Sequence, residues 1–152
     1  MRLSELLSQD RVVIVRGSPI DKNKALGKIA ELLSKGCAIP SSTLERVLRE
    51  REAVQSTGIG EGVAIPHAAL QELEHQVAAL LLVPEGIDFG ALDGQKVHLL
   101  FAIVGPKHAS GEHLKTVARI SKFLRNRDFR ARLLGASDPG SAQVMVVTEE
   151  AK

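Results

Sequence analysis

Continuous apolar runs alternate along the chain with stretches of helical periodicity. Two of the runs, residues 77–83 and 97–104, have the length of one strand and hold almost no polar residue, which is typical of strands buried on both faces of a sheet. The first is expected to end at Pro84-Glu85-Gly86 and the second at Gly105-Pro106, because such sequences form turns. A shorter β-branched run at residues 12–15 predicts a further strand.

Apolar residues spaced three and four positions apart predict the helices. A helix over residues 22–35 has Asp21 as its expected N-cap. Ser42 and Glu45 have the spacing of a capping box and predict a second helix that ends near Val54. Three further helical segments are expected: a turn at residues 3–7, a helix over about 112–124 with Leu114, Val117, Ala118, Ser121 and Leu124 on its inner face, and a short helix over 128–134.

The C-terminal segment, residues 137–147, carries two conflicting signals. Asp138-Pro139 favours the start of a helix, whereas the run from Val144 to Val147 favours a strand, and the pattern leaves both open. Elsewhere helical stretches alternate with β-rich runs, and no internal repeat is present. The predicted class is therefore α/β.

The densest turn signal in the chain lies in residues 56–68. Three glycines stand within five positions there, and glycine permits positive φ angles and a close approach of a ligand to the backbone. The turn runs into a short apolar strand, and Pro66 fixes its own φ and forces Ile65 to be extended, so that His67 leaves this strand in a defined direction. On this pattern alone, His67 is either an ordinary surface residue of a hairpin-like connection or a nucleophile.

Composition and charge narrow the class of protein. The 152 residues are 44% hydrophobic and 25% charged, which is typical of one folded domain over residues 1–152. The net charge of +2 does not favour nucleic acid as a partner. The basic stretch 115–132 lacks interleaved aromatics, so it is either solvated or faces an acidic partner.

Cysteine content and the apolar runs bear on the compartment. Cys37 is the single cysteine and can form no internal disulfide, and the N-terminus lacks the apolar run of a signal peptide. The apolar runs are also far shorter than the about 20 residues of a membrane helix. We therefore expect a cytoplasmic protein without a membrane segment.

The five histidines raise the question of a metal site. None of them forms a tight pair such as His-x-x-x-His, and Cys37 has no second thiol beside it. His75 and His108 are expected in surface loops and His98 in a strand. No metal site is therefore predicted.

The segment Gly60-x-Gly62-x-Ala64-Ile65-Pro66-His67 resembles the active-site signature of phosphotransferase-system enzyme IIA domains of the fructose, mannitol and nitrogen-regulatory type. The resemblance extends over nearly the whole chain. It implies a single domain with a mixed, roughly five-stranded sheet flanked by helices, and a helix at the C-terminus. It also implies that His67 carries a phosphoryl group and that no metal or organic cofactor is needed.

Two further residues match catalytic positions of this family. Arg51 lies just before the glycine turn, as the family's arginine does, and its fork of N–H groups suits phosphate oxygens. His113, near the start of a predicted helix, matches the second histidine of the family, and free N–H groups at a helix start favour an anion. Four residues of the turn are candidates for binding the phosphate, by donating hydrogen bonds from a hydroxyl or from backbone N–H groups: Thr57, Gly58, Gly60 and Gly62.

These expectations describe a phosphotransferase with a phosphohistidine intermediate. His67 is expected to accept a phosphoryl group from an HPr-like histidine phosphocarrier protein and to pass it on or signal its phosphorylation state to regulatory partners. The chain has no fused cysteine-bearing enzyme IIB domain, so it most resembles a stand-alone nitrogen-related enzyme IIA. Two alternatives remain, a sugar-transport enzyme IIA that donates phosphate to an enzyme IIB and a non-catalytic regulatory binding module on the same fold.

Overall fold

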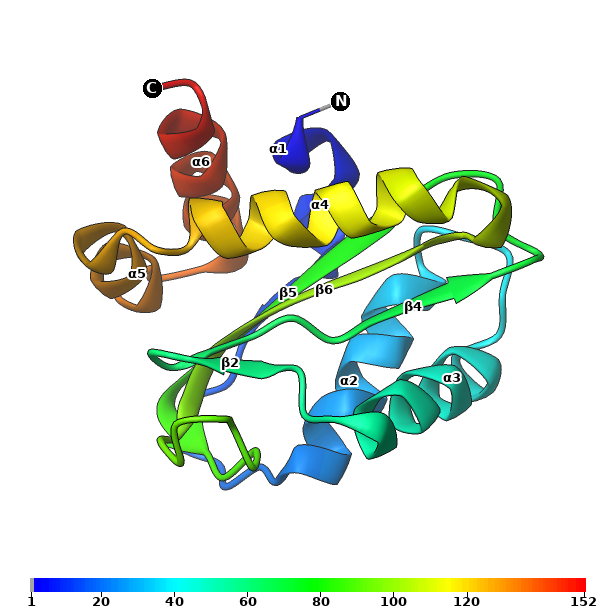
Figure 1. Ribbon diagram of the computed structural model, residues 1–152. Coiled ribbons are helices and arrows are strands. Elements are labelled where there is room, and N and C mark those ends of the chain that lie inside the picture. Colours follow the sequence, from blue (N-terminus) through cyan, green and yellow to red (C-terminus); the bar gives the residue numbers. More distant parts are fainter. Residues whose placement is uncertain (1) are drawn as a thin grey trace.

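The computed structural model, which describes residues 2–152, contains a mixed sheet with helices on both faces (Figure 1). The strands are β1 Val12–Ile14, β2 Gly58–Gly60, β3 Val63–Ala64, β4 His67–Leu70, β5 Val77–Ile87 and β6 Val97–Pro106. Their order is β1-β5-β6-β3-β2, and β4 also pairs with β6, beyond the end of β3. The pairs β5–β6 and β2–β3 are antiparallel and the others are parallel. The predicted α/β class, with a mixed sheet of roughly five strands, is confirmed.

Helices cover the two faces unequally (Figure 1). One face carries α2 (Lys22–Ser34) and α3 (Ser41–Val54), and the other carries α1 (Leu3–Leu6), α4 (Ser110–Phe123), α5 (Arg127–Leu134) and α6 (Pro139–Glu150). Single turns of 3-10 helix, η1 (Gln9–Arg11) and η2 (Lys107–Ala109), precede β1 and α4. No helix within residues 2–152 combines the length and the apolar character that crossing a bilayer requires.

The two central strands divide the core into two layers. In β5, Leu81 and Val83 pack toward α2 and α3, whereas Leu80 and Leu82 pack toward the other helices, and β6 alternates in the same way. Because both faces of the sheet are covered, residues 77–83 of β5 are apolar, and so are residues 97–104 of β6 apart from His98. This explains why their existence is readable from the sequence.

The termini of two predicted helices are capped as expected. Asp21 accepts a hydrogen bond from the backbone N–H of Lys24 at 2.8 Å and begins α2. Asp138 accepts one from the N–H of Ser141 at 2.7 Å and begins α6, with a proline in its first turn. The C-terminal segment is therefore a helix, which resolves the conflict in its sequence signals.

The end of β5 differs from the prediction. The strand does not stop at Pro84-Glu85-Gly86 but continues to Ile87, which pairs with Val97 after a shift of register. Gly86 has a φ of +86°, and the carbonyl of Pro84 lies 3.0 Å from Nδ1 of His98. A bulge thus accommodates a sequence that is typical of a turn, because His98 of the neighbouring strand satisfies the exposed carbonyl.

Two helix predictions were also wrong in detail. Helix α3 begins at Ser41 after Pro40, and no side-chain cap is formed, so Ser42 and Glu45 do not act as a capping box. In α4 the buried residues are His113, Thr116 and Ile120, whereas Leu114 is 63% exposed; Leu124, just after the helix, is buried as expected. Apolar periodicity missed part of this face because two of its buried residues, His113 and Thr116, are polar.

Candidate functional site

His67 is the first residue of β4, and the backbone around it is held from both sides. The carbonyl of Pro66 accepts a hydrogen bond from the N–H of Ile103 at 3.0 Å, and the N–H of Ile65 donates to the carbonyl of Thr57 at 3.0 Å. The Nδ1 atom of His67 lies 2.7 Å from the carbonyl oxygen of Ile65. Because a carbonyl oxygen only accepts, Nδ1 carries the proton, and Nε2 keeps a lone pair when the ring is neutral.

The electrostatic environment keeps His67 neutral. Partial burial of the ring lowers the pKa of His67, and the nearby Arg51 guanidinium lowers it further, while the Ile65 carbonyl and the Glu52 carboxylate oppose the change. The net result is a pKa below the ordinary value of 6.5. At neutral pH the lone pair on Nε2 is therefore available as a nucleophile.

The structure brings His113 beside His67. The two rings have centroids 5.8 Å apart and are tilted by 47°. His113 belongs to the first turns of α4 and is only 4% exposed. Burial lowers the pKa of His113, and the neighbouring His67 lowers it further, so this ring is also neutral.

Arg51 and His67 line one cavity of about 330 Å³ at the edge of the sheet. Nη1 of Arg51 donates to the carbonyl of Gln55 at 2.9 Å, which holds the side chain near the C-terminus of α3. Thr57 lines the same cavity. The apolar side chains around it include Ile59, Ile65, Leu92, Leu114 and Val117.

Thr57 is fixed by a buried carboxylate that the sequence analysis did not single out. The Thr57 hydroxyl donates to Oε2 of Glu52 at 2.6 Å, and its backbone N–H lies 3.0 Å from Oε1. Nζ of Lys22 lies 2.8 Å from the same carboxylate, which is 5% exposed. Burial alone would raise the pKa of Glu52, but the Lys22 ammonium and the Thr57 donors lower it overall. Glu52 continues the buried stripe of Leu44 and Leu48 at intervals of four residues, and this was the available signal.

The three glycines of the turn have different surroundings. A Cβ on Gly58 would lie 2.8 Å from the Cβ of Ala91, so glycine is needed there for close packing. Gly60 and Gly62 have φ angles of +102° and +81°, and a Cβ on them would meet the side chains of Asp93 and His98. None of the three lines the cavity that contains His67. The structure thus brings together His67, His113, Arg51 and Thr57 but does not bring Gly58, Gly60 and Gly62 to this cavity.

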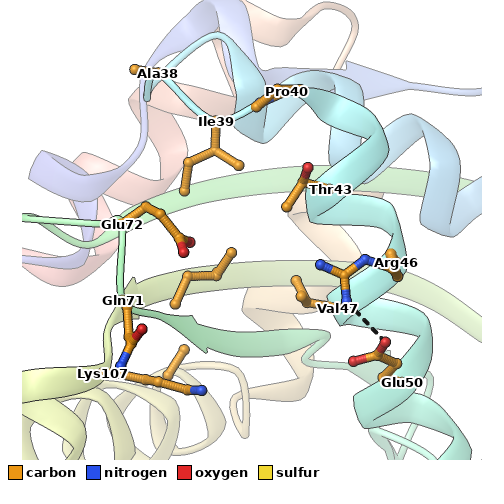
Figure 2. A pocket seen from close by; sticks show the side chains of 12 residues that line it. Ala38, Ile39, Pro40, Thr43, Arg46, Val47, Glu50, Gln71, Glu72 and Lys107 are labelled. Atoms are coloured by element: carbon orange, nitrogen blue, oxygen red, sulfur yellow. Dashed lines mark hydrogen bonds and ion pairs between the residues drawn. The ribbon is translucent and has the colours of Figure 1, made fainter.

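A larger cavity, of about 560 Å³, lies between α3 and the end of β4 (Figure 2). Its charged residues are two of each sign, and Arg46 pairs with Glu50 at 3.0 Å on its α3 wall. The opposite wall carries Glu72 and Lys107 (Figure 2). This cavity contains none of the site residues predicted from the sequence, so size alone does not locate the candidate chemistry.

Comparison with known proteins shows the family and the fold of this chain. Residues 5–146 match the family described as phosphoenolpyruvate-dependent sugar phosphotransferase system, EIIA 2. A nitrogen regulatory protein of Pseudomonas aeruginosa is 34% identical over 149 residues, which cover 97% of this chain and 96% of that protein. The crystal structure of nitrogen regulatory protein IIA-Ntr from Neisseria meningitidis superposes with a TM-score of 0.86 at 25% identity, covering 95% of this chain and 98% of the other. In the Escherichia coli complex of enzyme IIAMTL and phosphorylated enzyme IIBMTL, a chain 18% identical has the same fold, with a TM-score of 0.73 and coverage of 93% and 96%. The chain belongs to the EIIA 2 family of the phosphoenolpyruvate-dependent sugar phosphotransferase system.

Proposed function

We propose that this chain is a phosphocarrier in which Nε2 of His67 accepts a phosphoryl group from the phosphohistidine of an HPr-like protein. The bond from phosphorus to Nε2 forms as the bond to the donor imidazole breaks, and the donor nitrogen keeps the electron pair of that bond. The observation that carries the proposal is the 2.7 Å contact of Nδ1 with the Ile65 carbonyl. This contact fixes the tautomer that a nucleophilic Nε2 requires.

Arg51 and His113 are the residues proposed to hold the phosphoryl group during transfer. Phosphoryl transfer has a loose transition state, so the protein acts mainly by aligning the two nitrogens and by balancing charge on the equatorial oxygens. Arg51 shares the cavity with His67 and offers a planar set of donors, and the His113 ring lies 5.8 Å from the His67 ring. Thr57 supports the wall of the cavity, since its hydroxyl donates inward to Glu52.

The rim of this cavity suits a protein donor rather than a small molecule. Leu92 and Leu114 are 64% and 63% exposed, and Ile59 is 43% exposed, although all three are large apolar side chains. Exposed apolar residues gathered around a reactive group are typical of a protein docking surface. A partner that covers them would place its own phosphohistidine over His67 and exclude water from the transfer.

The downstream role proposed is regulatory. The nitrogen regulatory relative is aligned over nearly its whole length, which favours a protein that signals its phosphorylation state to target proteins. A sugar-transport role, with phosphate passed to an enzyme IIB, is the second candidate, and the complex formed by the Escherichia coli fold neighbour favours it. A purely non-catalytic module is disfavoured by the neutral His67 beside His113 and Arg51.

The test is phosphorylation in a reconstituted system. The protein is incubated with labelled phosphoenolpyruvate, enzyme I and an HPr-like carrier, and acid-labile label is measured. We expect the parent and the surface variant His75→Ala to be labelled and His67→Ala to stay unlabelled with an unchanged fold. Acid-labile label on His67→Ala would contradict the assignment, and rapid loss of label to an added enzyme IIB would identify a transport subunit.

A further inference from the structure

His113 belongs to a buried polar cluster at the contact between α4 and the sheet. His113 and Thr116 of α4 are 4% and 3% exposed. Gln76, which immediately precedes β5, reaches this cluster, and its Oε1 lies 3.0 Å from the Thr116 hydroxyl. The same hydroxyl lies 3.1 Å from the carbonyl of Glu112. These contacts hold the side-chain amide of Gln76 in place.

Three atoms of the cluster have no hydrogen-bond partner within residues 2–152. They are Nε2 of Gln76 and both ring nitrogens of His113, and all three are buried. Buried polar groups are almost always paired in folded proteins, so unpaired neighbours in one cluster indicate partners for each other or for a ligand. One of these atoms is an obligatory donor, the Gln76 amide nitrogen, and a neutral imidazole always contains one acceptor nitrogen.

The Gln76 amide nitrogen and the His113 ring both lie close to Gly105 of β6. The position that a Cβ of Gly105 would occupy is 3.1 Å from Nδ1 of His113 and 3.8 Å from Nε2 of Gln76. Gly105 pairs with Ala69 of β4, two residues after His67. The absence of a side chain at Gly105 therefore leaves the space in which Gln76 and His113 approach each other.

We propose that Gln76 is a positioning residue that donates from Nε2 to Nδ1 of His113, directly or through one water molecule, and so keeps the His113 proton on Nε2. The proposal rests on the proposed function, because its purpose is to present the Nε2–H group of His113 to the phosphoryl group on His67. With Nδ1 turned toward Gly105, Nε2 is the nitrogen left for that contact. Thr116 orients the amide by donating to Oε1 of Gln76.

The alternative arrangement is chemically well defined. If the Gln76 amide were reversed, Oε1 would face Nδ1 of His113 and the proton would move to Nδ1, while Thr116 would donate to the Glu112 carbonyl instead. Nε2 of His113 would then present a lone pair to an anionic phosphoryl group, which is repulsive. The two arrangements differ in one observable, the tautomer of His113.

The experiment is ¹⁵N nuclear magnetic resonance of the imidazole rings in the unphosphorylated protein at a pH where His113 is neutral. We expect the His113 proton on Nε2 in the parent and in the matched control Gln71→Glu, which changes an exposed glutamine of the same connection. In Gln76→Glu, a carboxylate that only accepts replaces the donor at nearly the same volume, and we expect the proton on Nδ1. Thr116→Val should populate both tautomers, and Thr116→Ser should restore the parent spectrum.

Phosphoryl transfer gives a second measurement. Gln76→Glu and Gln76→Leu should slow transfer to His67 by about 10–100-fold, by analogy with the loss of groups that orient metal-binding histidines. A parent with the His113 proton on Nδ1, or a Gln76→Glu variant with an unchanged tautomer, would overturn the role of Gln76 and leave the role of His67 intact. If Gln76→Leu does not fold, the spectra of the parent and of the two Thr116 variants still test the role of Gln76. If the parent has the expected tautomer but takes up no phosphate, the proposed function fails instead.

Discussion

Replacement of Glu52 by glutamine tests whether the buried carboxylate supports the wall of the cavity. The carboxylate accepts from the N–H and the hydroxyl of Thr57 and pairs with Lys22. Glutamine keeps one acceptor oxygen, so its NH₂ group must face Thr57 or Lys22. Hydrogen bonds to a charged group contribute about 1.5–3 kcal/mol each, and breaking a buried ion pair costs about 3–5 kcal/mol. Lys22 is 30% exposed and regains water in the variant, so the lower part of the range for a broken ion pair, about 3–5 kcal/mol, applies. We expect a loss of about 3 kcal/mol in the free energy of unfolding.

Urea denaturation followed by circular dichroism measures this loss. For a chain of this length, about 3 kcal/mol corresponds to a fall in Tm of about 6–12 °C. The pKa of Glu52 is below its ordinary value of 4.5 in the folded state, so its stabilisation is fully present above pH 4.5. It is lost as the pH falls through the lower pKa of the folded state, and the difference between parent and variant must narrow there. A loss below about 1 kcal/mol at pH 7, or a difference that widens on acidification, would refute the reasoning.

Three further predictions concern the cavity itself. Arg51→Ala should slow phosphoryl transfer by about 10²–10³-fold without affecting folding. Arg51→Lys should recover little of the rate, because an ammonium lacks the planar fork of N–H groups. Equal rates for Arg51→Lys and the parent would contradict this. Burial and Arg51 lower the pKa of His67, so the midpoint of the loss of phosphoryl acceptance on acidification should lie below pH 6.5 in the parent. Arg51→Ala should move that acid limb to higher pH, which a ring-proton titration of His67 measures directly. Leu114→Glu should raise the KM for the phosphorylated carrier by about tenfold or more, which is typical of losing an apolar anchor. Stability should be unchanged, because Leu114 is 63% exposed. An unchanged KM would show that α4 is not part of the docking surface.

The sequence predicts the sheet and helices well where one signal dominates. Residues 77–83, and residues 97–104 apart from His98, are apolar because the strands are covered on both faces. Asp21 and Asp138 mark helix starts through side-chain caps that form. The end of β5 was not predictable from Pro84 and Gly86 alone. Its continuation depends on His98 from the neighbouring strand, which is a tertiary contact.

The site was only partly predictable for a similar reason. The family resemblance pointed to His67, Arg51 and His113, and the structure brings the three together. Periodicity placed Leu114 on the buried face of α4 because apolar residues usually lie inside, but His113 occupies the interior. Glu52 was hidden among the charges at the end of α3. Whether a carboxylate on an apolar stripe is buried depends on Lys22 and Thr57, which the sequence of α3 does not contain.

The central claim, that Nε2 of His67 takes the phosphoryl group, is tested most directly by identifying the phosphorylated atom. The protein labelled uniformly with ¹⁵N is phosphorylated through an HPr-like carrier, and the one-bond coupling between phosphorus and nitrogen is assigned to one ring position. The structure predicts a single phosphohistidine, at Nε2 of His67, because Nδ1 is held by the Ile65 carbonyl at 2.7 Å. Phosphate on Nδ1 of His67 or on either nitrogen of His113 would contradict the account.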